Sequence, residues 1–470
     1  MEGQVTVAKD HAWRRGILIG VLVVGSVLGI VAALFFGLRH GGRSALDHDY
    51  GNFVAKPSFT GKFLDSRYAG GADMLEIPAR SGRFLGSDAA RTTFAVNLAV
   101  GDSQAGSERF ILAGYDANTK AKIYEVDAFE CAVVSEDGIV YCSSGQDSVI
   151  RGFDVRTGEQ VQSFPVHASR ARVYYLGHHG DTAILRLERY SAAGASVNQL
   201  LGVRDGAIAW HHDLPAQTSC QLIADGTAAL CQRELTSEEI AADPRWSGTN
   251  TLILTEVSSI SADDGSLLFQ GRDPGRVFPM SDGWYIHHLS SVPEARPDNT
   301  PVELSAFRAD GTEIERREKA GPYTLLPYSR DVDSPLYPYE AFREVMEHGT
   351  VVVDAEGKVA YQQMYTSHPQ GPDDFARAGE RNAAFQFDKF NNGLYAVSED
   401  ARMLLLSSYN HDHPGMDQHR LYDVQKQEDA LSFIGQRVTH TYIQNGLLAV
   451  SIEAENSQEP GKLVVCIPQG

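Results

Sequence analysis

The sequence is poor in positive charge. It contains 41 lysine and arginine residues against 61 aspartate and glutamate residues, a formal net charge of −20 at pH 7. Nucleic-acid phosphates are bound mainly by Lys and Arg, so this balance argues against a nucleic-acid partner. It also argues against a domain that lies on an anionic lipid surface. The simplest role of the excess acidic charge is to keep a large domain soluble.

Several motifs of common enzyme classes are absent as well. The sequence has no G-x-S-x-G nucleophile elbow, no H-E-x-x-H zinc motif and no G-x-x-x-x-G-K-[ST] phosphate loop. No cysteine precedes Cys131, which excludes a lipoprotein anchor near the N-terminus. We therefore predict no catalytic residue, no cofactor and no established metal site. An enzyme or small-ligand sensor whose site is assembled from distant segments stays open as an alternative.

Long apolar stretches are also missing, with one exception at 16–38, which reads GILIGVLVVGSVLGIVAALFFGL. About 20 apolar residues, rising 1.5 Å each, span a bilayer core. The run exceeds the apolar core of a cleaved signal peptide and lacks a small-x-small cleavage site after it, so we predict a transmembrane signal anchor. Three basic residues precede the run, Lys9, Arg14 and Arg15, and two follow it closely, Arg39 and Arg43. Because positive charge is enriched on the cytoplasmic side of membrane helices, this weak excess predicts a cytoplasmic tail at 1–15. A cleaved signal peptide is the alternative.

The remainder of the chain divides into two parts. Residues 39–74 are rich in Gly, Asp and Arg and show no steady hydrophobic period, which predicts a juxtamembrane spacer. Residues 75–470 contain many Gly, Val, Ile and Tyr and few long helical patterns. This composition predicts a β-rich domain that is large enough to bury a substantial core. With the tail at 1–15 in the cytoplasm, this domain is expected outside it.

Cysteine is scarce, but its spacing is regular. Four of the five cysteines form two pairs with ten residues between the members, namely Cys131 with Cys142 and Cys220 with Cys231. If each segment folds as a hairpin, the two cysteines of a pair lie opposite each other. Opposed strand residues have Cα atoms about 4.5–5.5 Å apart, which a disulfide can bridge. We predict two cross-strand disulfides and a free Cys466.

The residues between the cysteines favour such turns. Asp225 and Gly226 lie at the midpoint of the second pair, and Asp-Gly is typical of a two-residue type I′ turn. A four-residue loop at 135–138 gives the first pair the same opposition. Because disulfides persist in oxidising compartments, the pattern predicts a domain outside the cytosol. The alternative is that the four cysteines are small buried hydrophobic residues.

A longer unit recurs along the chain. Two β-rich stretches joined by an Asp-Gly or similar turn are followed by a further Asp with a Gly nearby, most clearly between Asp137 and Phe164. These turns are about 38 to 69 residues apart, loosely the period of four-stranded propeller blades. Asp initiates turns by accepting backbone N–H bonds, so the repeat needs no catalytic explanation. The Asp-centred turns are Asp116, Asp154, Asp205, Asp264, Asp310, Asp354 and Asp423. A C-terminal set of strands ending at Pro468 is expected to complete a blade with an N-terminal strand.

The unit that begins D-G-I-V-Y at Asp137 and continues F-D-x-x-T-G from Phe153 resembles the repeat of quinoprotein-type (PQQ-like) β-propellers. The resemblance implies an all-β fold, a propeller of seven or eight four-stranded blades over 75–470, in an extracytoplasmic setting. The resemblance does not by itself imply a quinone cofactor, because many proteins with this repeat bind none. The quinoprotein dehydrogenases have two adjacent cysteines near the cofactor, and no two cysteines are adjacent in this sequence. The closing Trp of the repeat is retained as Trp210, with Phe164 and Phe269 at similar places. An all-β domain that is not a closed propeller is the alternative.

One segment is rich in metal-ligating residue types. It lies in a loop predicted at 409–420 and contains His411, Asp412, His413, Asp417 and His419. Imidazole and carboxylate groups suit zinc and similar ions. The Pro and Gly of the same segment favour a solvated loop instead, so the metal site is the secondary interpretation.

Three further features have structural interpretations. The His-His pairs that begin at His178, His211 and His287 are predicted in strands, where neighbouring side chains face opposite sides and cannot chelate one ion together. Thr236 and Glu239 have capping-box spacing and predict a short helix at a blade rim. The Pro- and Tyr-rich stretch that follows Gly321 predicts a long loop.

The function that these features favour is a binding one. We expect a single-pass membrane protein whose external propeller serves as a protein-binding or scaffold module of the cell envelope. This expectation rests on architecture, because propellers present loops and a central channel to partners. An envelope enzyme or a small-ligand sensor with its site at the channel is the alternative.

Overall fold

The computed structural model describes residues 63–469 with gaps, of which the longest are 321–349 and 364–391. The chain divides into two compact units, Met1–Val54 and Ala55–Gly470, and the described residues belong to the second. The tail and transmembrane helix predicted at 1–15 and 16–38 lie outside the described residues. Among the residues that are described, no helix is long and apolar enough to cross a membrane.

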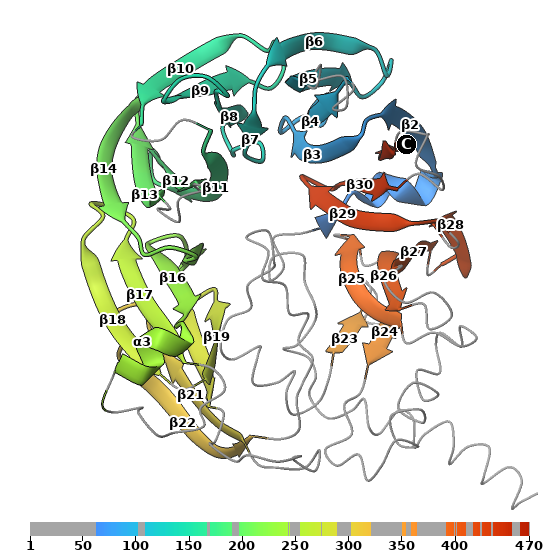
Figure 1. The fold of residues 1–470 in the computed structure, drawn as a ribbon. Helices are drawn as coiled ribbons and strands as arrows, with labels where there is room; N and C mark the ends of the chain where they lie inside the picture. Colours follow the sequence, from blue (N-terminus) through green and yellow to red (C-terminus); the bar gives the residue numbers. More distant parts are fainter. Residues whose placement is uncertain are drawn as a thin grey trace, which may run out of the picture. The chain divides into compact units, whose positions relative to one another are not determined.

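The described residues form an all-β fold (Figure 1). Five antiparallel sheets each contain four strands that follow one another along the chain, so strands that pair within a sheet are also neighbours in sequence. The first sheet contains β3 (Ser81–Ser87), β4 (Thr93–Val100), β5 (Arg109–Asp116) and β6 (Lys122–Asp127). The last contains β19 (Gly275–Met280), β20 (Gly283–His288), β21 (Val302–Phe307) and β22 (Glu313–Ala320).

Three four-stranded sheets lie between the first and the last in chain order, and two of them contain a cysteine pair. The first cysteine sheet comprises β7 (Glu130–Cys131), β8 (Ile139–Ser143), β9 (Val149–Asp154) and β10 (Gln160–Pro165). The intervening sheet comprises β11 (Arg172–His179), β12 (Thr182–Arg189), β13 (Val197–Arg204) and β14 (Ala207–Asp213). The second cysteine sheet comprises β15 (Ser219–Ile223), β16 (Ala228–Glu234), β17 (Thr255–Ser261) and β18 (Leu267–Asp273).

A larger sheet joins the two ends of the described chain. It contains β25 (Asn392–Ser398), β26 (Met403–Tyr409), β27 (Asp417–Asp423), β28 (Glu428–Ser432), β29 (Val438–Gln444), β30 (Leu447–Ile452) and β31 (Lys462–Pro468). The N-terminal β2 (Ala72–Pro78) pairs antiparallel with β31, so a strand from the start of the domain completes the last group, as the sequence predicts. β2 is thereby the outermost strand at one end of this sheet, and β1 is the outermost strand at the other.

Shorter elements complete the described structure. They are β1 (Phe63–Leu64), the 3₁₀ helix η2 (Ser66–Gly70), the helix α3 (Ser237–Ala242), and the hairpin of β23 (Thr350–Val353) and β24 (Val359–Gln363). The first described strand begins at Phe63, inside the stretch that composition assigned to a spacer. The number of blades stays a prediction, because much of the chain between β22 and β25 lies outside the described residues.

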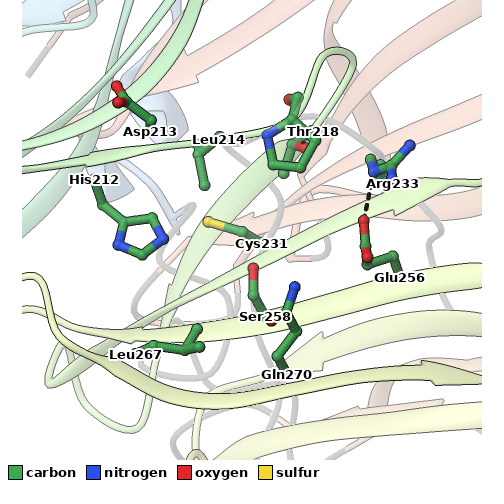
Figure 2. A pocket seen from close by; sticks show the side chains of 11 residues that line it. His212, Asp213, Leu214, Thr218, Cys231, Arg233, Glu256, Ser258, Leu267 and Gln270 are labelled. Carbon is green, nitrogen blue, oxygen red and sulfur yellow. Dashed lines mark hydrogen bonds and ion pairs between the residues drawn. The ribbon is translucent and has the colours of Figure 1, made fainter.

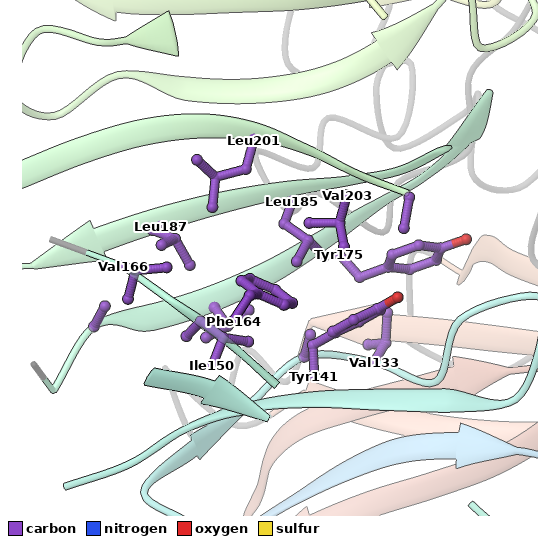
Figure 3. Packing of buried hydrophobic residues seen from close by; sticks show 14 residues of the cluster. Val133, Tyr141, Ile150, Phe164, Val166, Tyr175, Leu185, Leu187, Leu201 and Val203 are labelled. Atoms are coloured by element: carbon purple, nitrogen blue, oxygen red, sulfur yellow. The ribbon is translucent and has the colours of Figure 1, made fainter. Parts of the chain in front are cut away.

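The hydrophobic core is divided among the spaces between successive sheets. One cluster, for example, combines Tyr141 and Phe164 of the first cysteine sheet with Leu185 and Leu201 of the intervening sheet (Figure 3). Other clusters join the neighbouring sheets in the same way. Alternating strand residues fill these spaces from both sides. Four-stranded antiparallel sheets that pack face to face in chain order are the construction of a β-propeller.

The Asp-centred turns occupy one place in this repeat. Where they are described, they connect the third strand of a sheet to the fourth. At Asp154, one carboxylate oxygen accepts the N–H groups of Arg156 at 2.8 Å and Thr157 at 3.1 Å. Asp116, Asp264, Asp310 and Asp423 accept turn N–H groups in the same manner. These aspartates are therefore structural, as predicted; Asp354 lies outside the described residues.

The fourth strands share a β-bulge that the sequence did not reveal. In each bulge one residue of the fourth strand has no partner on the third. After four of these bulges, the next residue lies against a turn glycine of the following sheet. The bulge residues are Ile123, Val161, Ala209, Leu268, Ile314 and Ala430. A bulge twists an outer strand and protects its edge from pairing with another chain.

The residue after the bulge docks on a turn glycine of the next sheet. Trp210 lies against Gly265, which has a φ of 72°, and its indole N–H donates to the carbonyl of Ala262 at 3.2 Å. A Cβ at Gly265 would lie 2.6 Å from the indole, so glycine is required there. Phe269 docks in the same way, as predicted.

The prediction for the first cysteine sheet is wrong by two residues. Gln162, not Phe164, follows the bulge and lies against the turn glycine Gly206. Phe164 instead fills the core cluster beside Tyr141. The single bulged residue Val161 shifts which side chain faces the next sheet, and a bulge cannot be read from hydrophobic spacing alone.

Both cysteine pairs lie at disulfide distance, with each cysteine directly opposite its partner. The Cα–Cα distances are 4.0 Å for Cys131–Cys142 and 4.1 Å for Cys220–Cys231. Cys466 is free and buried, and burial raises the pKa of its thiol to about 12.

The turns between the cysteines differ from each other. The loop predicted at 135–138 is present, with the Gly138 N–H donating to the Ser135 carbonyl at 2.9 Å. The two-residue turn predicted at Asp225 and Gly226 is present: both residues have positive φ, 53° and 85°, and the Thr227 N–H donates to the Ala224 carbonyl at 3.0 Å. The regular strand pairing ends one step earlier, at Ile223 and Ala228, and the cysteines lie opposite each other as predicted.

Candidate functional site

A pocket of about 210 Å³ lies between the intervening sheet and the second cysteine sheet (Figure 2). Strand β14, the segment that follows it and three strands of the second cysteine sheet form its walls. The lining residues are His212, Asp213, Leu214, Pro215, Thr218, Cys231, Arg233, Glu256, Ser258, Leu267 and Gln270. Cys231 of the second cysteine pair is part of this wall, whereas the sequence singled it out only as half of a structural bridge.

The segment 214–218 forms a wall that buried side chains hold in place. Asn198 donates to the carbonyls of Pro215 at 3.1 Å and Thr218 at 2.9 Å. Arg186, which is buried beside Glu188, also donates to the Thr218 carbonyl. Backbone carbonyls anchored in this way keep the segment in one conformation, so the pocket does not depend on a ligand for its shape.

A row of charged residues forms the opposite wall. The guanidinium of Arg233 contacts Glu256 at 2.6 Å and Glu239 at 2.9 Å, and Arg272 contacts the other oxygen of Glu256 at 3.1 Å. Arg233 and Glu256 are largely buried, so removal of one partner would leave a buried charge without compensation. The row is therefore a neutral, mutually satisfied support for the pocket.

Helix α3 contributes to this wall through its first turn. The Thr236 N–H donates to the Glu239 carboxylate at 2.9 Å, and the Glu239 N–H donates to the Thr236 hydroxyl at 3.2 Å. This is the capping box that the sequence predicts. Hydrogen bonds from Arg233, then from Thr236, lower the pKa of Glu239 to about 2. The carboxylate is consequently ionised at neutral pH and holds Arg233 against the sheet.

The interior of the pocket combines apolar surface with neutral polar groups. Leu214 and Leu267 flank it, and His212, Ser258 and Gln270 point toward it in Figure 2. The imidazole Nδ1 of His212 lies 3.2 Å from the Gly265 carbonyl, so we assign the proton to Nδ1 and a lone pair to Nε2. Among the described residues, no hydrogen bond is made by the Ser258 hydroxyl or the Gln270 amide.

The predicted metal-ligand segment is only partly described. His411, Asp412 and His413 lie outside the described residues. Asp417 and His419 belong to strand β27 and not to a loop, and the buried His419 lies 3.0 Å from the Thr441 hydroxyl through Nε2. Among the described residues, no group of three or more His, Cys, Asp or Glu side chains is placed to hold a metal ion.

The paired histidines of β11 face opposite sides, as predicted. Nε2 of His178 lies 3.9 Å from Asp137 of the first cysteine sheet, and Nε2 of His179 lies 3.0 Å from Asp263 of the second. Each imidazole thus reaches a different neighbouring sheet, and the pair cannot bind one ion. The second residue of another pair, His212, lines the pocket.

Sequence reasoning found little of this site. Of the lining residues, it had singled out only Cys231 and His212, each for another reason. Ser258 and Gln270 face Cys231 across neighbouring strands. Polar side chains on a sheet face that packs toward another sheet indicate a possible pocket. This pattern can be recognised only when the strand register is known, and a single sequence does not provide the register.

Comparisons with known proteins concern the fold alone. No protein-family model matches the chain, and no curated protein matches it. Among solved structures it is similar to the quinohemoprotein alcohol dehydrogenase of Comamonas testosteroni, with 11% identity, a TM-score of 0.42, and coverage of 87% of this chain and 78% of that chain. It is also similar to the β-propeller domain of the Trilobed protease of Pyrococcus furiosus, with 9% identity, a TM-score of 0.41, and coverage of 85% and 94%. No ligand or activity follows from these similarities.

Proposed function

We propose that this protein is a membrane-anchored, extracytoplasmic β-propeller that binds another protein through its outer wall. The two disulfides support an oxidising compartment. The apolar run at 16–38 supports a membrane anchor. An acidic domain on such a tether is suited to soluble or protein partners more than to the lipid surface itself.

The observation that carries the binding role is the placement of exposed apolar side chains. Among the described residues, the large apolar side chains that are most exposed all belong to outermost strands: Met74, Ile123, Val161, Leu267, Leu268 and Ile314. Single exposed apolar residues are ordinary on protein surfaces, but adjacent ones beside a pocket are typical of interaction sites. Leu267 and Leu268 are adjacent, and Leu267 lines the pocket.

A photo-cross-linking scan tests this proposal. The photoreactive residue p-benzoylphenylalanine replaces, one at a time, four bulge residues with similar exposure, Ile123, Val161, Leu268 and Ile314. In cells, Leu268 should yield a reproducible cross-linked protein, and the other three should not. Absence of a cross-linked protein at all four positions would contradict the proposal.

A further inference from the structure

We infer that the pocket between the intervening sheet and the second cysteine sheet binds an uncharged carboxamide group, the side chain of an Asn or Gln on a partner polypeptide. The part of this inference that concerns the partner rests on the proposed function. The part that concerns the chemistry of the pocket rests on the residues that line it.

The charges of the pocket argue for an uncharged ligand. Arg233 and Arg272 are bound to Glu256, and Arg233 is bound also to Glu239, so this row already compensates its own charge. The Asp213 carboxylate points away from the other labelled side chains in Figure 2 and accepts the Gln199 amide at 2.7 Å. An anion that entered the pocket would lose hydration without finding a positive charge that is not already compensated.

The polar groups that line the pocket, with the exposed Gln270 among them, match an amide. His212 offers a lone pair at Nε2, while Ser258 and Gln270 offer both donors and acceptors. A carboxamide has two N–H donors and one carbonyl acceptor, so it can use an acceptor at His212 together with groups of both kinds at the other two residues. A lone hydroxyl has one donor, and an aliphatic side chain has none, so both leave more of these groups without a partner.

The size and shape of the pocket agree with this assignment. A volume of about 210 Å³ equals roughly seven waters at about 30 Å³ each, which accommodates a single side chain. Leu214 and Leu267 provide apolar surface for its methylene groups. The anchored segment 214–218 and the disulfide hold the walls before the ligand arrives, which reduces the entropic cost of binding.

The partner is indicated by the surface at the pocket mouth. Leu267 is 48% exposed and Leu268 is 43% exposed, and they are consecutive on the outermost strand β18. A free small amide would have no use for this apolar surface, whereas a polypeptide can place apolar residues on it while one side chain enters the pocket. The bulge at Leu268 interrupts the regular edge, which favours docking of side chains over the addition of a strand.

The chemistry of the pocket can be tested without knowing the partner. The probes are N-acetylglutamine N-methylamide and its charged isostere N-acetylglutamate N-methylamide, measured by saturation-transfer NMR on the full-length protein in lipid nanodiscs. We expect the glutamine probe to bind about 2–10-fold more strongly than the glutamate probe, the range for one or more lost hydrogen bonds. Equal binding of both probes would overturn the inference and leave the proposed function intact.

Two variants locate the binding and separate the possible sources of the amide. Gln270→Leu should abolish most of the glutamine-probe signal, whereas Gln160→Leu, an exposed glutamine on β10, should leave it unchanged. In cells, Gln270→Leu should also weaken the cross-link at Leu268. If the probe binds but the cross-link persists in Gln270→Leu, the partner does not use the pocket and the inference is overturned for a polypeptide source. If no cross-link forms at any scanned position, the proposed function fails, and the probe experiment alone decides the chemistry.

Discussion

The two cysteine sheets have the same local design and different surroundings. In both, a disulfide joins the first strand to the second, and a residue of the third strand lies beside the second cysteine. In the first sheet that residue is Arg151, whose guanidinium reaches Asp147 at 2.5 Å. In the second sheet it is Ser258, and the pocket opens beside it. The position opposite the second cysteine thus holds an arginine in one sheet and a serine that lines a pocket in the other.

The comparison extends to the residue on the fourth strand. Arg151 pairs with Ser163, whereas Ser258 pairs with Gln270. A long charged side chain covers its neighbours with its methylene groups, and a serine cannot. The short side chain of Ser258 therefore leaves room for the pocket beside Cys231.

The largest expected difference in stability is between variants of Trp210 and Gln162, the side chains that pack on a turn glycine of the next sheet. Trp210→Ala, between the intervening sheet and the second cysteine sheet, should lower the free energy of unfolding by about 3–5 kcal/mol because it removes a large buried side chain. Gln162→Ala, at the corresponding place one sheet earlier, should cost less than about 1 kcal/mol. Urea unfolding followed by circular dichroism measures both. Equal losses would show that the two contacts between sheets are equivalent.

The next prediction concerns the disulfides. Replacing either pair by alanine should cost about 3 kcal/mol, the entropic value for a loop of this length. Under limited reduction, the Cys220–Cys231 bond should open before the Cys131–Cys142 bond, because Cys231 lines the pocket. Mass mapping of alkylated peptides gives the order. Reduction of Cys131–Cys142 first would contradict the difference between the two sheets.

A smaller effect on stability is expected when the residues opposite the second cysteine, Arg151 and Ser258, are exchanged between the two cysteine sheets. Ser258→Arg should place a long side chain in the pocket and abolish binding of the glutamine probe. Arg151→Ser should lose the ion pair with Asp147, which is partly exposed and contributes less than about 1 kcal/mol. Saturation-transfer NMR and urea unfolding measure the two effects. Retained binding in Ser258→Arg would place the probe elsewhere.

The smallest effect depends on pH and concerns Glu239, in the helix that follows the second strand of the second cysteine sheet. The pKa of Glu239 is lowered to about 2, so its contribution is complete above the ordinary value of 4.5 and is lost as the pH falls toward 2. Because the side chain is 37% exposed, the contribution should stay below about 1 kcal/mol. The stability difference between the wild type and Glu239→Gln should therefore shrink between pH 4.5 and 2. A difference that grows with acidification would contradict this sign.

The features predicted from the sequence are those set by nearby residues. Cysteine spacing predicted the opposition of Cys131 with Cys142, and the capping box at Thr236 predicted the start of a helix. Both depend on contacts within a few residues or within one hairpin. The Asp-centred turns at Asp154 and its equivalents were predictable for the same reason.

The features that escaped prediction depend on strand register and on neighbouring sheets. The bulge at Val161 moved the docking position from Phe164 to Gln162. The pocket needs Ser258 and Gln270 in one row with Cys231 and a second sheet to close it. A shift of one residue would turn these side chains to the opposite face, so no local pattern identifies them.

The most direct test of the central claim, an exported binding module, is a count of reactive thiols in protein taken from intact cells. Cells are lysed in denaturant with a maleimide mass tag, with or without prior reduction, and the tagged protein is resolved by size. Of the five cysteines, we predict that only Cys466 is tagged without reductant and that all five are tagged after reduction. Five tagged cysteines without reductant would place the domain in a reducing compartment and contradict the account.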